Sequence, residues 1–331
     1  MKSFELKGHA RPVQYLQFNT EGDLFFTTGR EQFALVWSFE TGEMLGSYDS
    51  QGAMRGCDVN YTSSMLVTAG ADSTAGLWNV RDGTRYATIE LETPVQCVRF
   101  SHGDTHVLAV TTDVHRCVPQ VQLFKLPDDV PASKGEDYAP VMRFENPSSV
   151  ITFATFGPMN NTIYFATRDG EMKIADVETG QTVVNKKVHD GEIMRFRWDK
   201  EYQTPITASV DSTAKLLDSR SLDVIQTYEY EKGKIVFDAD IAPKADHVII
   251  AGGDDPQSVT NVSRNVFETR FCHKMTGKTL GKVDGHFGTV NTLAFHPLGK
   301  GFVTGAEDSS IRLHHFDDSY CGSPGAEDVR F

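Results

Sequence analysis

The chain has 331 residues, of which 39% are hydrophobic and 23% charged, and its formal net charge is −13. This is the composition of a globular protein with a sizeable core, and its acidic balance argues against broad binding to nucleic-acid phosphates. No apolar run approaches the roughly 18 residues that span a bilayer, and no secretory leader is visible, so we expect a cytoplasmic protein. Five widely spaced cysteines without a Cys-x-x-Cys pair indicate reduced thiols.

The N-terminal part of the chain alternates hydrophobic and polar residues as short strands do. Residues 13–18 and 24–26 are separated by the turn Glu21-Gly22-Asp23, and a further strand-like segment ends at Trp37. Four and five residues beyond Trp37, the pair Thr41-Gly42 marks another turn. We therefore expect several short strands joined by tight turns rather than helices.

The same unit recurs along the whole chain. A small polar residue is followed four residues later by an acid and six residues after that by an aromatic or apolar anchor. The anchors, which lie roughly 40 to 55 residues apart, are Trp37, Trp78, Phe124, Ala175, Leu217, Cys272 and His314. Units of this length with four short strands are typical of propeller blades. The sequence therefore predicts an all-β fold, a seven-bladed β-propeller of the WD40 type.

The two ends of the chain indicate how the ring closes. After His314-His315-Phe316 the strand-like alternation stops, whereas residues 3–6 precede the first complete unit. We expect the N-terminal strand to complete the seventh blade, because closure removes an exposed sheet edge. Residues 1–320 are then one propeller domain and residues 321–331 a short tail. Three segments lengthen the period and are either recognition loops or tolerated insertions: 113–119, 127–140 and 252–266.

Polar residues that recur at fixed places in the units are expected to satisfy one another inside the blades. A His near the start of a unit reaches a Thr on a strand, an acid holds a turn, and a Trp indole donates a hydrogen bond. Glu31 takes the acid position of the first unit. The predicted structural set is His9, Thr27, Trp37, Thr68, Asp72, Trp78, Thr207, His286, Thr304 and Asp308.

Segments that resemble catalytic or ligand motifs do not complete them. Gly277-Lys278-Thr279 lacks the earlier glycine of a phosphate loop and lies in a hairpin turn. His102 and His106 flank a turn, and the adjacent His314 and His315 point to opposite faces of a strand. We therefore predict no catalytic residue, no metal site, no cofactor and no enzymatic activity. A propeller enzyme would instead need polar groups that converge in the central channel.

Motifs near both ends carry a family resemblance. They include Gly8-His9, Asn19 with Glu21-Gly22-Asp23, Gly285-His286-Phe287-Gly288, Phe295-His296-Pro297 and the run from Ile311 to Phe316. These segments resemble the family of subunit i of eukaryotic translation initiation factor 3. The resemblance implies a non-enzymatic scaffold that is held by the C-terminal part of subunit b and an N-terminal segment of subunit g. It also implies a place near the small ribosomal subunit through the complex, without direct nucleic-acid binding.

The resemblance implies that partners dock around blades 5 and 6. Acidic residues there could pair with Arg or Lys of a partner helix, and they are Asp211, Asp218, Asp223, Glu229 and Glu231. Reversing the charge of Asp211 and Asp218 together is expected to weaken binding of subunit b and to leave the fold intact. The alternative is another WD-repeat adaptor, of the signalling or ubiquitin-ligase type.

Overall fold

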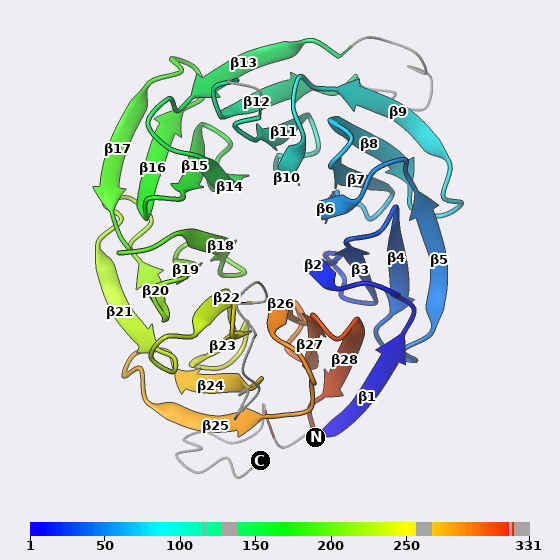
Figure 1. Ribbon diagram of the computed structural model, residues 1–331, viewed down its shortest axis with the longest axis vertical. Coiled ribbons are helices and arrows are strands. Elements are labelled where there is room, and N and C mark those ends of the chain that lie inside the picture. Colours follow the sequence, from blue (N-terminus) through cyan, green and yellow to red (C-terminus); the bar gives the residue numbers. More distant parts are fainter. Residues whose placement is uncertain (115–116, 128–137, 256–266, 318–319, 321–331) are drawn as a thin grey trace.

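The computed structural model describes residues 1–114, 117–127, 138–255, 267–317 and 320. These residues form seven antiparallel sheets of four strands each. The sheets are arranged radially around a common centre, so that the molecule is a ring of blades (Figure 1). The chain is therefore a seven-bladed β-propeller, as the repeat predicts.

In each of blades 1 to 6, four consecutive strands of the chain are ordered from the centre of the ring outward (Figure 1). In blade 7 the three last strands are ordered in the same way, and the first strand of the chain lies outermost. The innermost strands are β2 (Val13–Phe18), β6 (Met54–Val59), β10 (Val95–Phe100), β14 (Ile151–Phe156), β18 (Ile193–Trp198), β22 (Ile235–Ile241) and β26 (Val290–Phe295). The second strands are β3 (Leu24–Gly29), β7 (Met65–Gly70), β11 (His106–Thr111), β15 (Thr162–Thr167), β19 (Pro205–Ser209), β23 (His247–Gly253) and β27 (Gly301–Ala306).

The outer half of each blade has the same order. The third strands are β4 (Phe33–Ser38), β8 (Thr74–Asn79), β12 (Gln120–Lys125), β16 (Glu171–Asp176), β20 (Thr213–Leu217), β24 (Thr269–His273) and β28 (Ser310–His315). The outermost strands are β5 (Met44–Asp49), β9 (Arg85–Glu90), β13 (Pro140–Glu145), β17 (Thr182–Lys187), β21 (Val224–Glu229), β25 (Thr279–Val283) and, in blade 7, β1 (Lys2–Lys7).

Burial along the blades explains the sequence pattern. The second strands are almost wholly buried, as β3 is from Phe25 to Gly29, because neighbouring blades cover both of their faces. The outermost strands are largely exposed and alternate in burial, as β17 does. The core is therefore the space between blades, and buried and exposed residues alternate most clearly in outermost strands such as β17.

The ring closes through its first strand. β1 pairs antiparallel with β28, with Lys2 opposite His315 and Lys7 opposite Ser310. In Figure 1 the N-terminal strand lies along the outer side of β28. This confirms the predicted closure and gives blade 7 its fourth strand, which removes the free edge of β28.

The predicted anchors all lie on the third strands. Trp37 of β4 stands opposite Phe25 of β3, and His314 of β28 stands opposite Phe302 of β27. The His314 ring stacks on that of Phe302 at a centroid distance of 4.3 Å, so an imidazole takes the place that Trp37 has in blade 1. Gly42, in the turn after β4, has φ of 72°, a conformation that glycine adopts without steric cost.

Every innermost strand carries an irregularity near its start, which the sequence pattern does not reveal. In β2 the register shifts between Val13 and Tyr15, and the six other innermost strands shift at the corresponding place. Such bulges re-aim a side chain. In blade 7 the bulged residue is Asn291, whose Nδ2 donates to the Val13 carbonyl oxygen of blade 1 at 2.9 Å.

Some sequence predictions fall outside the described residues. The candidate loops 113–119, 127–140 and 252–266 are described only in part, since 115–116, 128–137 and 256–266 lie outside. The tail 321–331 also lies outside.

Candidate functional site

A chain of hydrogen bonds joins the recurring polar residues in blade 1. His9 Nε2 lies 2.8 Å from Thr27 Oγ1, and His9 Nδ1 lies 3.2 Å from Glu31 Oε1. Trp37 Nε1 donates to the same Thr27 oxygen at 2.9 Å. Burial lowers the pKa of His9, although Glu31 opposes that shift. These hydrogen bonds attach the segment before β2, which contains His9, to the second and third strands of the blade.

Blade 7 repeats this arrangement, with Asp308 in the position that Glu31 has in blade 1. His286 Nε2 lies 2.8 Å from Thr304 Oγ1, and His286 Nδ1 lies 3.3 Å from Asp308 Oδ2. Asp308 also accepts from the Phe287 backbone N–H at 2.7 Å. Burial opposes ionisation of Asp308, but hydrogen bonds from His286 and Ser310 outweigh it and lower its pKa.

Blade 5 contains a third copy, and its histidine was missed by the sequence reasoning. His189 Nε2 lies 2.8 Å from Thr207 Oγ1, and His189 Nδ1 lies 2.8 Å from Asp211 Oδ2. The missed signal is the spacing: His and Thr are 18 residues apart in this pair, as they are in blades 1 and 7. His189 follows Val188, whereas His9 and His286 each follow a glycine, so the Gly-His pair that marks the other two histidines is absent here.

Blade 2 keeps the tryptophan contact without a histidine. Trp78 Nε1 donates to Thr68 Oγ1 at 2.9 Å. Asp72 accepts from the Thr74 hydroxyl at 2.7 Å, and the Ser50 hydroxyl lies 3.4 Å from its other oxygen. A serine therefore reaches the acid where the other blades use a histidine.

The five acidic residues predicted to bind partners separate into two groups. Asp218 and Asp223 flank the turn between β20 and β21, where Leu217 pairs with Val224. Asp211, Glu229 and Glu231 lie at the other end of the blade, where Thr213 pairs with Glu229. At about 3.3 Å per residue, the six residues of β21 place the groups roughly 20 Å apart. The structure therefore does not bring all five into one patch.

The contacts of Asp211 conflict with one expectation from the sequence. Its side chain is 13% exposed, it bonds His189, and it accepts from Thr213 Oγ1 at 2.6 Å. Burial opposes its ionisation, but the bonds from His189 and Thr213 outweigh burial and lower its pKa. Reversing the charge of Asp211 would break this network, so that substitution would disturb blade 5.

The other acids of blade 5 are more accessible. Asp218 accepts from the backbone N–H groups of Arg220 and Ser221 at 2.9 and 2.8 Å and so holds its turn. The side chain of Asp223 is 67% exposed and forms an ion pair with Lys186 of the neighbouring blade. Glu231 lies 3.9 Å from Arg270.

Polar groups converge in the central channel, which sequence reasoning did not foresee. The guanidinium groups of Arg99, Arg195 and Arg197 lie over the Tyr15 ring, at 4.8, 4.4 and 5.5 Å from its centroid. Arg195 and Arg197 point to the same side of β18, because residues two apart share a face of a strand. The channel therefore holds a basic cluster inside an acidic protein.

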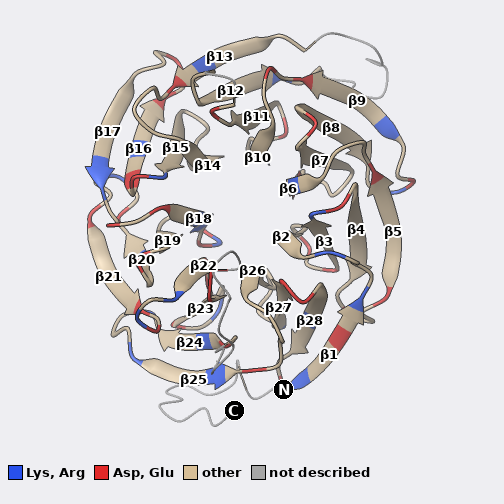
Figure 2. Cartoon of the chain, in the orientation of Figure 1, with Lys and Arg blue, Asp and Glu red and all other residues tan. Residues whose placement is uncertain are grey.

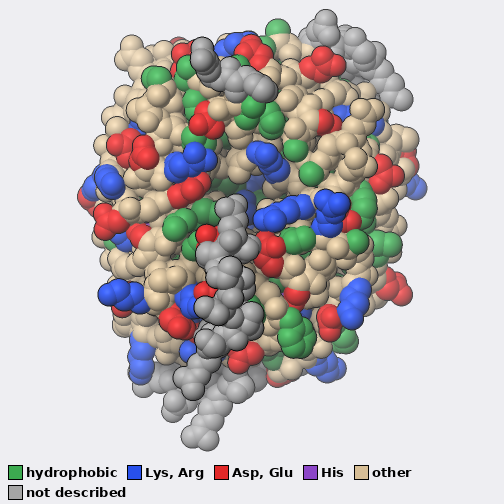
Figure 3. Space-filling model, in the orientation of Figure 1, with side chains coloured by type: hydrophobic (Ala, Val, Ile, Leu, Met, Phe, Trp, Pro, Cys, Tyr) green, Lys and Arg blue, Asp and Glu red, His purple; other side chains and the backbone are tan. Residues whose placement is uncertain are grey.

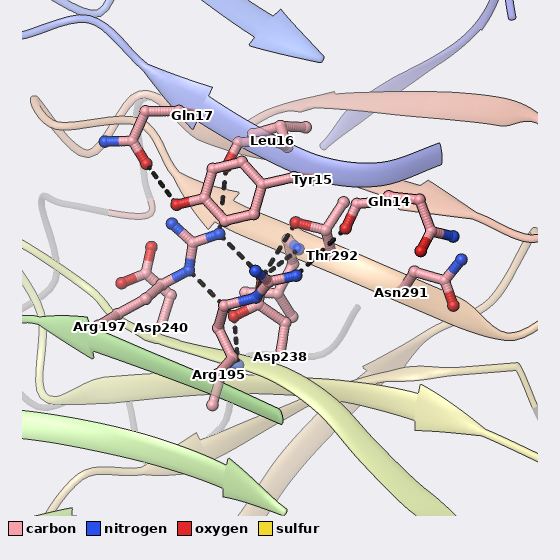
Figure 4. Close-up of polar contacts among 12 residues, drawn as sticks. Gln14, Tyr15, Leu16, Gln17, Arg195, Arg197, Asp238, Asp240, Asn291 and Thr292 are labelled. Carbon is pink, nitrogen blue, oxygen red and sulfur yellow. Dashed lines mark hydrogen bonds and ion pairs between the residues drawn. The ribbon is translucent and has the colours of Figure 1, made fainter. Parts of the chain in front are cut away.

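One buried carboxylate balances two of these arginines. Arg197 Nε and Nη2 donate to the two oxygens of Asp238 at 3.0 and 2.8 Å, and Arg195 Nε lies 3.8 Å from it (Figure 4). Asp238 also accepts from Thr292 Oγ1 at 3.0 Å. These contacts join blades 5, 6, 7 and 1, although the buried Nε of Arg195 has no hydrogen-bond partner among the described residues.

Charges of both signs are mixed over the part of the surface that the structure describes. Lys and Arg are interspersed with Asp and Glu around the ring (Figure 2), and on the face turned to the reader in Figure 3 some basic side chains gather beside its centre. Within the described ranges, no three His, Cys, Asp or Glu residues are grouped to hold a metal ion. The described part of the chain also contains no helix of the length and apolarity that a membrane span requires.

Comparison with known proteins places this geometry in a family. The family model described as EIF3I matches residues 1–323. The chain is 37% identical over 319 residues to eukaryotic translation initiation factor 3 subunit I of Drosophila willistoni, with 95% of this chain and 98% of that protein covered. The protein of the same name from Schizosaccharomyces pombe is 34% identical over 327 residues, with 97% and 98% covered.

A third relative, from Bombyx mori, carries the same name and is 34% identical over 326 residues, with 97% of each chain covered. The similarity therefore extends over the propeller as a unit, from the closing strand β1 to the last strand, β28. The chain belongs to the family of eukaryotic translation initiation factor 3 subunit I.

Proposed function

We propose that this chain is a non-enzymatic scaffold subunit of the eukaryotic translation initiation factor 3 complex. It binds peptide segments of subunits b and g in the cytoplasm and supports assembly on the small ribosomal subunit during initiation. The observation that carries this proposal is the family match over residues 1–323, together with relatives that bear the name of a translation initiation factor subunit.

The described structure supports a scaffold in two ways. The ring closes through β1, and the polar groups of the channel bond one another, as Arg197 and Asp238 do. A rigid ring offers preformed surfaces, so a flexible partner segment bears most of the ordering cost. We also infer that residues 1–320 act as one domain.

For subunit b, the proposed contact is the end of blade 5 that carries Asp218 and Asp223. The side chain of Asp223 is 67% exposed, so it is accessible to a basic partner segment. Asp211 contributes instead by holding its turn through His189. The proposed contact surface is therefore acidic but does not include Asp211, because its side chain already bonds His189.

The test is titration calorimetry of the chain with the purified C-terminal part of subunit b. The double variant Asp218→Lys with Asp223→Lys is expected to bind roughly tenfold more weakly. Asp82→Lys is the matched control, because Asp82 holds the corresponding turn of blade 2 by accepting from the Thr84 N–H at 2.9 Å. Full affinity of the double variant would reject the surface, and no binding by the unaltered chain would reject the role.

A further inference from the structure

A cavity of about 770 Å³ opens at the end of the ring where the innermost strands finish. All seven blades contribute to its walls, including the turns that follow β2, β6, β10 and β18. Many wall residues are aromatic, among them Phe156, Phe196, Trp198 and Tyr202. Its size lies in the range of ligand pockets, roughly 300 to 1,000 Å³, and such pockets combine apolar walls with a few polar groups.

Tyr202, at the mouth of this cavity, has an unusual backbone. Its φ is 56°, in the left-handed region that bulky side chains rarely adopt. At the corresponding turns of other blades, small residues or glycine have positive φ, and these are Gly22, Ser63, Asp104, Asn160 and Gly299. Strain of this kind persists where the surrounding structure enforces it and gathers at functional sites. In blade 5 it places a large ring where the other blades have none.

The strained ring forms one wall of the mouth. It packs edge-on against His102 at a centroid distance of 4.3 Å and lies 5.9 Å from the Trp198 ring. Tyr202 is 37% exposed, so part of it remains open to a ligand. Burial raises the pKa of Tyr202 to about 12, so its hydroxyl stays a hydrogen-bond donor at neutral pH.

The cavity offers hydrogen-bond donors that the described residues leave unused. His102 Nε2 is buried and has no hydrogen-bond partner. The Tyr202 hydroxyl and the Lys200 ammonium, which also line the cavity, have no partner among the residues that the structure describes. Three groups able to donate therefore line one cavity without a partner among the described residues. Burial lowers the pKa of His102, so its ring donates as the neutral form with the proton on Nε2.

Each carboxylate that lines the same cavity accepts a hydrogen bond from a backbone N–H group of the chain. Asp58 accepts from the Phe100 N–H at 2.8 Å, and Asp240 accepts from the Phe295 N–H at 2.7 Å. Asp104 accepts from the Tyr61 N–H at 3.1 Å, and Asp199 accepts from the Gln203 N–H at 2.6 Å. The carboxylates thus have donors from the chain itself, whereas Tyr202, Lys200 and His102 offer donors to a guest, and a carboxylate of the guest can accept from them.

We propose that this cavity binds an acidic peptide segment of a partner protein, with an Asp or Glu side chain received by Tyr202, Lys200 and His102. Apolar neighbours in that peptide pack on the aromatic walls. We choose a peptide over RNA because the net charge of −13 repels a polyphosphate more strongly than a single carboxylate. The site differs in chemistry from the acidic end of blade 5, which would attract basic segments, so neither proposal depends on the other.

The test begins with selection of a random-sequence peptide library on the full chain, with the Tyr202→Gly variant used for counter-selection. Glycine suits this backbone, as Gly22 and Gly299 do at the corresponding turns, so we expect the variant to fold and to melt no lower than the unaltered chain. The recovered peptides are expected to carry Asp or Glu beside an aromatic or large apolar residue.

Binding of one recovered peptide is then measured by fluorescence anisotropy. Tyr202→Gly and Lys200→Glu should each weaken it by roughly tenfold or more. Lys278→Glu, the same charge reversal in an exposed turn outside the cavity, should leave it unchanged. Three results would overturn the proposal: no peptide enriched over the counter-selection, enrichment of basic peptides, or binding only of a single-stranded RNA oligonucleotide that Lys200→Glu abolishes.

Discussion

Arg197 of blade 5 donates from Nη2 to the backbone carbonyl oxygen of Leu16 in blade 1, at 3.2 Å and across the central channel. The same guanidinium group binds both oxygens of Asp238 in blade 6. Blades 1, 5 and 6, of which only 5 and 6 are neighbours in the ring, are thereby joined at one side chain. A network of this kind limits relative motion of the blades, which is the property that a docking scaffold requires.

The first prediction concerns the buried carboxylate of this network. Asp238→Asn should lower the free energy of unfolding by about 3 to 5 kcal/mol, because it leaves the charges of Arg195 and Arg197 uncompensated in the interior. Urea unfolding at neutral pH measures this change. Asp223→Asn is the control, since it removes only an exposed ion pair with Lys186 and should leave the free energy of unfolding nearly unchanged. Equal losses in the two variants would contradict the account of the channel.

A second prediction tests the histidine of blade 5. His189→Ala should lower the free energy of unfolding by about 2 kcal/mol, because Thr207 and Asp211 lose a buried hydrogen-bond partner. His106→Ala, at the start of β11, should change it by less than about 0.5 kcal/mol. Thermal and urea unfolding of both variants provide the comparison, and a stable His189→Ala protein would show that this network is dispensable.

The third prediction is a pH dependence set by Asp240. Burial raises the pKa of Asp240 to about 6 from the ordinary value of 3.8, with Arg197 opposing the shift. Between these values the folded chain binds more protons than the unfolded chain, so this group favours folding at low pH and loses that contribution as pH rises toward 6. The loss at neutral pH amounts to about 3 kcal/mol.

The measurement is urea unfolding of the unaltered chain and Asp240→Asn at several pH values between 4 and 7. The stability of the unaltered chain relative to the variant should fall as pH rises through this range. Asp82→Asn is the control, because Thr84 hydrogen bonds lower the pKa of Asp82, and its contribution changes only below about pH 4. A relative stability that rises with pH would show that the carboxylate is not desolvated in the fold.

The fourth prediction tests closure of the ring. Deleting residues 2–7 removes β1 and exposes the edge of β28, which then lacks its backbone partners. We expect a lower unfolding midpoint and self-association, measured by urea unfolding and light scattering, because a free strand edge pairs with other chains. A shortened chain that stays monomeric with the original midpoint would contradict closure by β1.

The repeat architecture could be predicted because its signals are local. Each blade has turns at fixed spacings, so the anchors and the closing strand follow from the sequence even where His314 replaces an aromatic residue. His189 is recognisable from its separation of 18 residues from Thr207, but Val188 stands in place of the glycine that precedes His9 and His286. The channel cluster could not be found in this way, because Tyr15 and Arg99 meet only when the ring closes.

The cavity mouth shows the same limit. Tyr202 stands at a turn position where other units have Gly22 or Asn160, so the sequence does contain the exception. The shape of the cavity mouth depends also on His102 from another blade, whose side chain packs against the Tyr202 side chain only in the folded structure. The five acidic residues of blade 5 lie close together in the sequence, yet β20 and β21 place them at opposite ends of the blade.

The most direct measurement is affinity purification of the tagged full chain from the cells that make it, followed by quantitative mass spectrometry. Our account predicts recovery of initiation factor 3 subunits b and g at levels close to that of the chain, together with small ribosomal subunit proteins at lower levels. Recovery of ubiquitin-ligase or signalling partners, without subunits b and g, would contradict the central claim.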